Sequence, residues 1–183
     1  MLRDFFFGLN GVLMLLRLDG RGMLFFSPTG PGALRSFIVA IIIFPVYALI
    51  TYLDWLKEGE PAAFHYFVMH FLGYAIGWMA YPVVMFELTR IMGVAGFFPR
   101  YLAAYNYSVI PITLFMLPIE MLNYLFPNQE VGMMGLVTIV MVMNFQWFIC
   151  RFGLMVRPAI AVGLVLIDTT LSIIIHSLVN KLV

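Results

Sequence analysis

Charged residues are scarce in this 183-residue sequence. They make up 10% of the chain, whereas about a quarter of a typical soluble domain is charged. Hydrophobic residues account for 63% of the chain, and the mean hydropathy is +1.02. So few polar side chains cannot cover a water-soluble core. The composition therefore excludes a soluble globular protein and predicts that lipid surrounds most of the chain.

Cysteine and the motifs of common enzymes are also missing. Cys150 is the only cysteine, which excludes an intramolecular disulfide. The three histidines and Cys150 lack the spacing of metal ligands, and no GxSxG, P-loop or HExxH motif occurs. The basic residues are too few and too dispersed to bind nucleic acid. We expect no enzymatic activity, no catalytic residue, no metal and no cofactor, and bound lipids are compatible with the sequence.

Five long apolar runs are present, and each is long enough to be a transmembrane helix. A helix needs roughly 20 residues to cross about 30 Å of hydrocarbon, and lipid offers no partner for unpaired backbone groups. We predict an all-α membrane protein with spans at about residues 33–53, 63–88, 101–126, 131–150 and 158–179. The third run contains Pro111 and Pro118, which leaves open whether its helix is kinked or broken.

The first 32 residues differ from the spans. Apolar residues recur there every three or four positions, which is the spacing of one helical face. The members of this stripe are Leu2, Phe5, Phe6, Leu9, Val12, Leu13 and Leu16. The run is too short to cross a bilayer. We predict that residues 1–32 form a cytoplasmic amphipathic helix in the membrane interface and a turn-rich linker, followed by the transmembrane domain 33–183.

Arginines gather on one side of the predicted spans. Eight of the ten basic residues lie before or at the start of the first span or flank the second and fourth connections, namely Arg3, Arg17, Arg21, Arg35, Arg90, Arg100, Arg151 and Arg157. Cytoplasmic loops are enriched in Lys and Arg. We therefore predict a bacterial inner-membrane protein with a cytoplasmic N-terminus and a periplasmic C-terminus. Four or six spans would break this alternation.

Asp168 lies near the middle of the last predicted span. Placing a charged side chain there costs several kcal/mol of free energy, so an acid at this position is a candidate functional residue. Ser172 and His176 follow at four-residue steps on the same helical face. One interpretation is a proton or ion relay from Asp168 to His176. The other, which we favour, is a hydrogen-bonded Asp168 that fixes helix packing through Asn144 or Gln146. The predicted intramembrane polar network is Asp168, Ser172, His176 and Asn144.

Small residues recur on one face of the second predicted span. Gly73 and Gly77 are four residues apart, with His70 before them and Ala80 after them on nearly the same face. Such a face lets two helix backbones approach closely. We predict a helix-packing face of His70, Gly73, Gly77 and Ala80, used within the protein in preference to contact with another subunit.

The stretch from Gly96 to Pro111, GFFPRYLAAYNYSVIP, resembles the basic entry, tyrosine and proline that open the third helix of Yip1-domain membrane proteins. Five spans with a cytoplasmic N-terminus also match that family. The DLYGP-type motif of its eukaryotic members is absent, and the chain resembles the short bacterial form. The resemblance implies a non-enzymatic role in membrane organisation or assembly, and it supplies no catalytic residue.

Three functions fit the sequence. The leading hypothesis is a non-enzymatic protein that acts through helix and lipid contacts, with membrane lipids, other membrane subunits or further copies of itself as partners. An alternative is an accessory subunit of a larger respiratory or photosynthetic membrane complex. A small ion or solute transporter that uses Asp168 ranks last, because five spans cannot divide into two equal inverted repeats.

Overall fold

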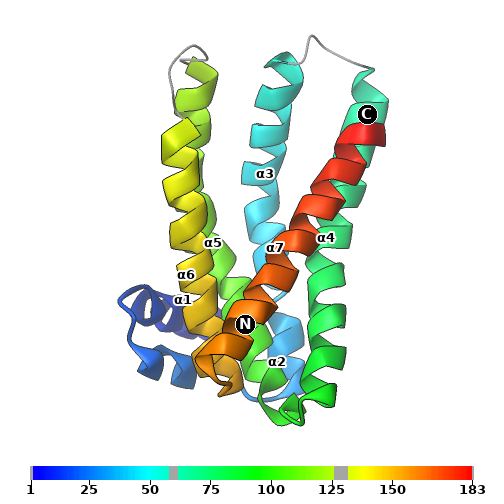
Figure 1. Cartoon of the computed structure of the whole chain (residues 1–183). Helices are drawn as coiled ribbons and strands as arrows, with labels where there is room; N and C mark the ends of the chain where they lie inside the picture. The colour runs from blue at the N-terminus through cyan, green and yellow to red at the C-terminus, as the bar shows by residue number, and fades with distance from the viewer. Residues whose placement is uncertain (1, 58–61, 126–131, 183) are drawn as a thin grey trace.

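The computed structural model describes residues 2–57, 62–125 and 132–182, and all regular elements in these ranges are helices (Figure 1). In chain order they are α1 (Leu2–Leu16), η1 (Gly20–Phe25), α2 (Gly30–Arg35), α3 (Ile38–Lys57), α4 (Ala63–Ile91), η2 (Ala95–Phe97), α5 (Phe98–Leu125), α6 (Gly132–Leu154) and α7 (Pro158–Leu182), where η denotes a 3-10 helix.

Five helical stretches are long and apolar enough to cross a bilayer. They are Gly30–Lys57, which comprises α2 and α3, and the helices α4, α5, α6 and α7. Large apolar side chains such as Ile41, Met79 and Leu166 cover their outer faces, and hydrocarbon is the medium that suits such surfaces. The predicted fold class is confirmed: the chain is a multi-pass helical membrane protein.

The spans extend beyond the bounds predicted from apolar residues alone. α4 continues to Ile91, α5 begins at Phe98, and α6 continues to Leu154. The last turns of α4 and α6 include Arg90 and Arg151, whose long side chains reach water from inside a helix. Polar residues near the bilayer boundary therefore do not mark the helix ends.

α5 is one helix from Phe98 to Leu125, although Pro111 and Pro118 lie inside it. A proline removes one backbone hydrogen bond, and transmembrane helices tolerate this loss where neighbouring groups compensate. The third span is therefore not broken. The helix runs without interruption from the end of the bundle where the arginines lie to the opposite end.

The N-terminal helix α1 lies at the flank of the bundle, at the end where α5 begins and α6 ends (Figure 1). Val12 and Leu15 are completely buried against the protein. A Cβ atom on Gly8 would lie only 2.5 Å from the ring of Tyr107 on α5, so α1 and α5 approach closely. Leu13, in contrast, points outward. The single apolar stripe expected from the sequence is therefore divided between two faces, one on protein and one facing out.

The predicted turn-rich linker contains two short helices instead. Asp19 caps η1 by accepting a hydrogen bond from the backbone N–H of Arg21 at 3.0 Å. The Arg21 side chain also donates a hydrogen bond to Asp19, which lowers the pKa of that carboxyl. Thr29 caps α2 by accepting from the N–H of Gly32. Side-chain caps of this kind explain why a segment rich in turn residues becomes helical.

Exposed apolar side chains of α1, of η1 and of the turn between them make up what we call the outer apolar patch. Its members are Phe6, Phe7, Leu13, Leu16, Leu18, Leu24 and Phe25. The rings of Phe7 and Phe25 are 6.1 Å apart and join the two helices. The patch lies at the same end of the bundle as the eight arginines named above.

The contact between α1 and η1 predicts a test of the fold. A Cβ atom on Gly22 would lie 2.5 Å from the backbone oxygen of Gly11, and backbone cannot move aside without strain. Gly22→Ala should therefore destabilise the protein by about 1–3 kcal/mol. The control is Gly96→Ala, whose added Cβ meets no atom within 4 Å. Thermal unfolding in detergent should show a lower Tm for Gly22→Ala alone, and equal Tm values would contradict this packing.

Candidate functional site

A short stretch of α5 supplies polar side chains to the elements around it. Over residues 101–108, side chains of this helix hydrogen-bond to α4, α7, α6 and the C-cap of α2. The pairs are Tyr101 with Tyr81, Tyr105 with Asp168, Ser108 with Gln146, and Asn106 with Ser36. Most of these side chains are buried. In a membrane protein the pairs link helices directly, because lipid offers the polar groups no other partner.

Asp168 on α7 is held by Tyr105. The hydroxyl of Tyr105 donates to Oδ1 of Asp168 at 2.9 Å. The ring of Tyr105 stacks against that of Tyr81, with ring centres 4.5 Å apart, and the hydroxyls of Tyr81 and Tyr101 hydrogen-bond to each other. Three tyrosines from α4 and α5 are thus linked to one another, and Tyr105 connects them to the acid in the middle of α7.

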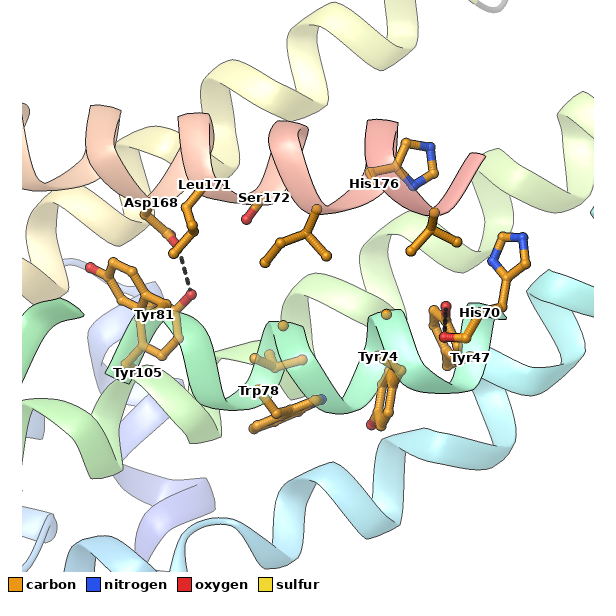
Figure 2. Close-up of a pocket in the computed structure, with 15 residues that line it drawn as sticks. Tyr47, His70, Tyr74, Trp78, Tyr81, Tyr105, Asp168, Leu171, Ser172 and His176 are labelled. Atoms are coloured by element: carbon orange, nitrogen blue, oxygen red, sulfur yellow. Dashed lines mark hydrogen bonds between the residues drawn. The ribbon is translucent and has the colours of Figure 1, made fainter. Parts of the chain in front are cut away.

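A pocket of about 290 Å³ opens beside Asp168, between α4 and α7, with α3 and α5 as its remaining walls (Figure 2). Figure 2 shows Asp168 with Tyr81 and Tyr105 at one end of the pocket and His70 with His176 at the other. Ser172 lies between them on α7. The walls between the two ends are mostly aromatic and apolar, and they include Trp78.

Three of the four residues of the predicted polar network line this pocket, but the structure shows no hydrogen bond among them. Eight residues of helix separate Asp168 from His176, a distance of about 12 Å. His176 contacts Asn180 on its own helix instead, at 3.2 Å. Asn144 does not reach Asp168: its amide donates to the Val140 carbonyl of α6 at 2.8 Å. It lines a separate hollow between α6 and α7.

The predicted small-residue face has two different environments. A Cβ atom on Gly73 would lie 2.5 Å from the Val179 side chain, so this glycine permits close contact between α4 and α7. A Cβ atom on Gly77 would meet nothing within 4 Å, so the missing side chain leaves open space in the wall of the pocket. The backbone carbonyl of His70 accepts a hydrogen bond from Tyr47 on α3. Ala80 is half-buried.

The pocket combines a carboxylate, two imidazoles and aromatic walls, a set that suits a small polar or cationic solute. Among residues 2–57, 62–125 and 132–182, no cluster of three or more His, Cys, Asp or Glu side chains is arranged to hold a metal ion. Cys150 is a free, buried cysteine.

Sequence reasoning missed the linked tyrosines beside Asp168. Tyr101, Tyr105 and Ser108 follow the i, i+4, i+7 spacing of one helical face. A polar face of this kind inside an apolar span is the signal that identifies a buried contact surface. The same stretch carries the resemblance to Yip1-domain proteins, but its hydrogen-bonding role follows only from the packed structure.

Comparison of the chain with protein-family models, with curated proteins and with solved structures finds no match.

The Tyr105–Asp168 contact predicts an energetic coupling between α5 and α7. Tyr105→Phe and Asp168→Asn, alone and combined, form a double-mutant cycle. We expect a coupling free energy of about 0.5–2 kcal/mol in unfolding experiments in mixed micelles, as interhelical hydrogen bonds in membranes give. Tyr52→Phe is the control, because Tyr52 is exposed on α3 and remote from Asp168. Strictly additive effects of the two substitutions would contradict the contact.

Proposed function

We propose that this protein is non-enzymatic and acts in membrane organisation or assembly through helix and lipid contacts. The observation that carries the proposal is the double-faced N-terminal helix. One face of α1 is packed against the protein, with Gly8 against Tyr107 of α5 and Leu15 against Gly22 of η1, while Leu13 and the rest of the outer apolar patch are exposed. An apolar surface of this kind at a bilayer boundary inserts into the headgroup and acyl boundary.

The arginines support an orientation for this proposal. They favour a cytoplasmic position for the α1 end of the bundle, because that side of a membrane is enriched in basic loops. The outer apolar patch would then enter the cytoplasmic leaflet of a bacterial inner membrane. A rigidly held patch expands one leaflet more than the other, since insertion adds area on that side alone. Such an insertion favours curvature or recruits partners to the site.

The resemblance to short bacterial Yip1-domain proteins agrees with this proposal. The stretch that carries the resemblance, residues 96–111, begins the helix on which α1 packs. Lipids are the proposed primary partners, and other membrane subunits or copies of this chain are the proposed protein partners.

The outer apolar patch predicts an effect on membrane shape. Leu13→Asn combined with Leu24→Asn should remove the apolar contact with lipid without touching the buried face of α1. We expect vesicles with the wild-type protein to be smaller or tubular in cryo-electron micrographs, and vesicles with the double variant to keep protein-free diameters.

The control for this experiment is Leu125→Asn combined with Leu182→Asn, which alters exposed leucines at the opposite end of the bundle. This control should deform vesicles as the wild type does. Equal deformation by the patch variant, at equal reconstituted density, would show that insertion of α1 does not shape the membrane.

The pocket beside Asp168 favours a second candidate function, which is the binding or passage of a small solute. Gly77→Leu should fill the pocket, since the space beside Gly77 is open, and should leave Tm unchanged or higher. Under this second function, proteoliposomes should show a proton or amine flux that Gly77→Leu abolishes. Ala75→Leu on the exposed face of α4 is the control. Wild-type flux equal to that of empty vesicles would exclude transport.

A further inference from the structure

A second cavity, of about 600 Å³, lies at the arginine-rich end of the bundle, between α1, the segment 24–32 and the first turns of α5. Its polar lining includes the side chains of Asp4, Ser27, Thr29, Arg35, Arg100 and Tyr107. Its apolar lining includes Phe7, Leu24 and Phe25, three members of the outer apolar patch. The cavity therefore has a polar lining with two arginines and opens beside the exposed outer apolar patch.

Arg100 is the unusual member of this lining. Its Nε atom is buried and has no hydrogen-bond partner. Within the residues that the structure describes, no carboxylate pairs with its guanidinium. A buried donor without a partner is costly and calls for a partner from outside the protein. The planar guanidinium matches a phosphate group, which accepts two parallel N–H bonds from it.

The charges around the cavity favour an anion. Arg35 contacts Asp4 at 3.3 Å, so its charge is partly balanced. The charge of Arg100 has no such partner in the described part of the chain. Together the charged side chains Asp4, Arg35 and Arg100 give the lining a net charge of +1. Ser27 and Thr29, whose hydroxyls are 2.8 Å apart, and Tyr107 add neutral donors. One phosphodiester would neutralise this site.

We propose that this cavity binds the phosphate of an anionic phospholipid, with Arg100 as its principal ligand and the acyl chains lying on the outer apolar patch. The proposal rests on the proposed function, because it needs this end of the bundle to lie at the bilayer boundary. Basic pockets between transmembrane helices on the cytoplasmic side bind anionic headgroups in this way. A zwitterionic lipid fits less well, because its cationic end would add charge beside the arginines.

The test compares Arg100→Met with Arg157→Met in the full-length protein in detergent. Arg157 is exposed at the same end of the bundle and does not line the cavity. Short-chain phosphatidylglycerol, short-chain phosphatidylcholine and inorganic phosphate are each titrated, with thermal stabilisation and lipid retention in native mass spectrometry as readouts. Phosphatidylglycerol should stabilise the wild type and Arg157→Met most, and should bind Arg100→Met roughly tenfold more weakly or worse.

The thermal stability of each variant without added lipid gives a readout that does not depend on lipid binding. Because Arg100 has an unsatisfied buried donor, Arg100→Met without lipid should be at least as stable as the wild type. A large loss of Tm in that variant would show that Arg100 has a structural partner and would overturn the proposal. Arg100→Lys, which keeps the charge and loses the bidentate geometry, should bind phosphatidylglycerol with intermediate strength.

The remaining outcomes identify the ligand or reject it. Equal stabilisation by phosphatidylcholine, or by phosphatidylglycerol in the wild type and Arg100→Met, overturns the anionic-lipid site. Stabilisation by inorganic phosphate that matches phosphatidylglycerol shows that the source is a free phosphate, which also overturns the lipid assignment. These titrations use no bilayer, so their failure is distinguishable from a failure of the vesicle experiment on the outer apolar patch.

Discussion

The requirement that polar groups find partners inside the protein, because hydrocarbon supplies none, governs this fold. The polar stretch of α5 from Tyr101 to Ser108 meets that requirement for four neighbouring elements at once. Each of its hydrogen bonds fixes the rotation of a partner helix about its own axis, because the partner side chain must face α5. Apolar contacts alone would not fix that rotation, since lipid-facing and protein-facing apolar surfaces are chemically alike.

These hydrogen bonds lie in the half of α5 nearer the arginines, which explains the shape of the bundle. Figure 1 shows α5 and α6 diverging from α4 and α7 toward the end opposite α1. In the diverging half, α3 and α4 are linked through tyrosine hydroxyls that donate to backbone carbonyls, from Tyr47 to His70 and from Tyr74 to Ala40. The pocket beside Asp168 lies between α4 and α7, where Gly77 provides space that no side chain fills.

The sequence was sufficient to predict five long apolar helices, the short N-terminal apolar helix and the clustering of arginines, because each depends on residue spacing or on total hydropathy. It was not sufficient to pair Asp168 with Tyr105. Asn144 and Tyr105 are both polar residues in apolar spans, and only the rotation of each helix decides which of them faces α7. The two faces of α1 were missed for a related reason: periodicity reports that a face is apolar, not whether protein or lipid covers it. The short helices η1 and α2 depend on caps from Asp19 and Thr29, which overrode the turn propensity of their glycines and prolines.

The surroundings of Asp168 and of Arg100 differ in whether the side chain already has a hydrogen-bond partner inside the protein. Asp168 has its partner in Tyr105, and the pair lies where rotation of α5 or α7 would separate them, so its contribution to packing is evident from the contact itself. Arg100, about one turn earlier on α5, has a buried Nε without such a partner among the described residues, and it lines the cavity at the arginine-rich end. The Asp168 carboxyl already accepts a hydrogen bond inside the bundle, whereas the unpaired Nε–H of Arg100 leaves that guanidinium with free energy to gain from a phosphate in its cavity. For this reason the arginine-rich end, rather than the intramembrane acid, is where the structure favours recognition of an outside molecule, and α5 places both regions on one continuous helix.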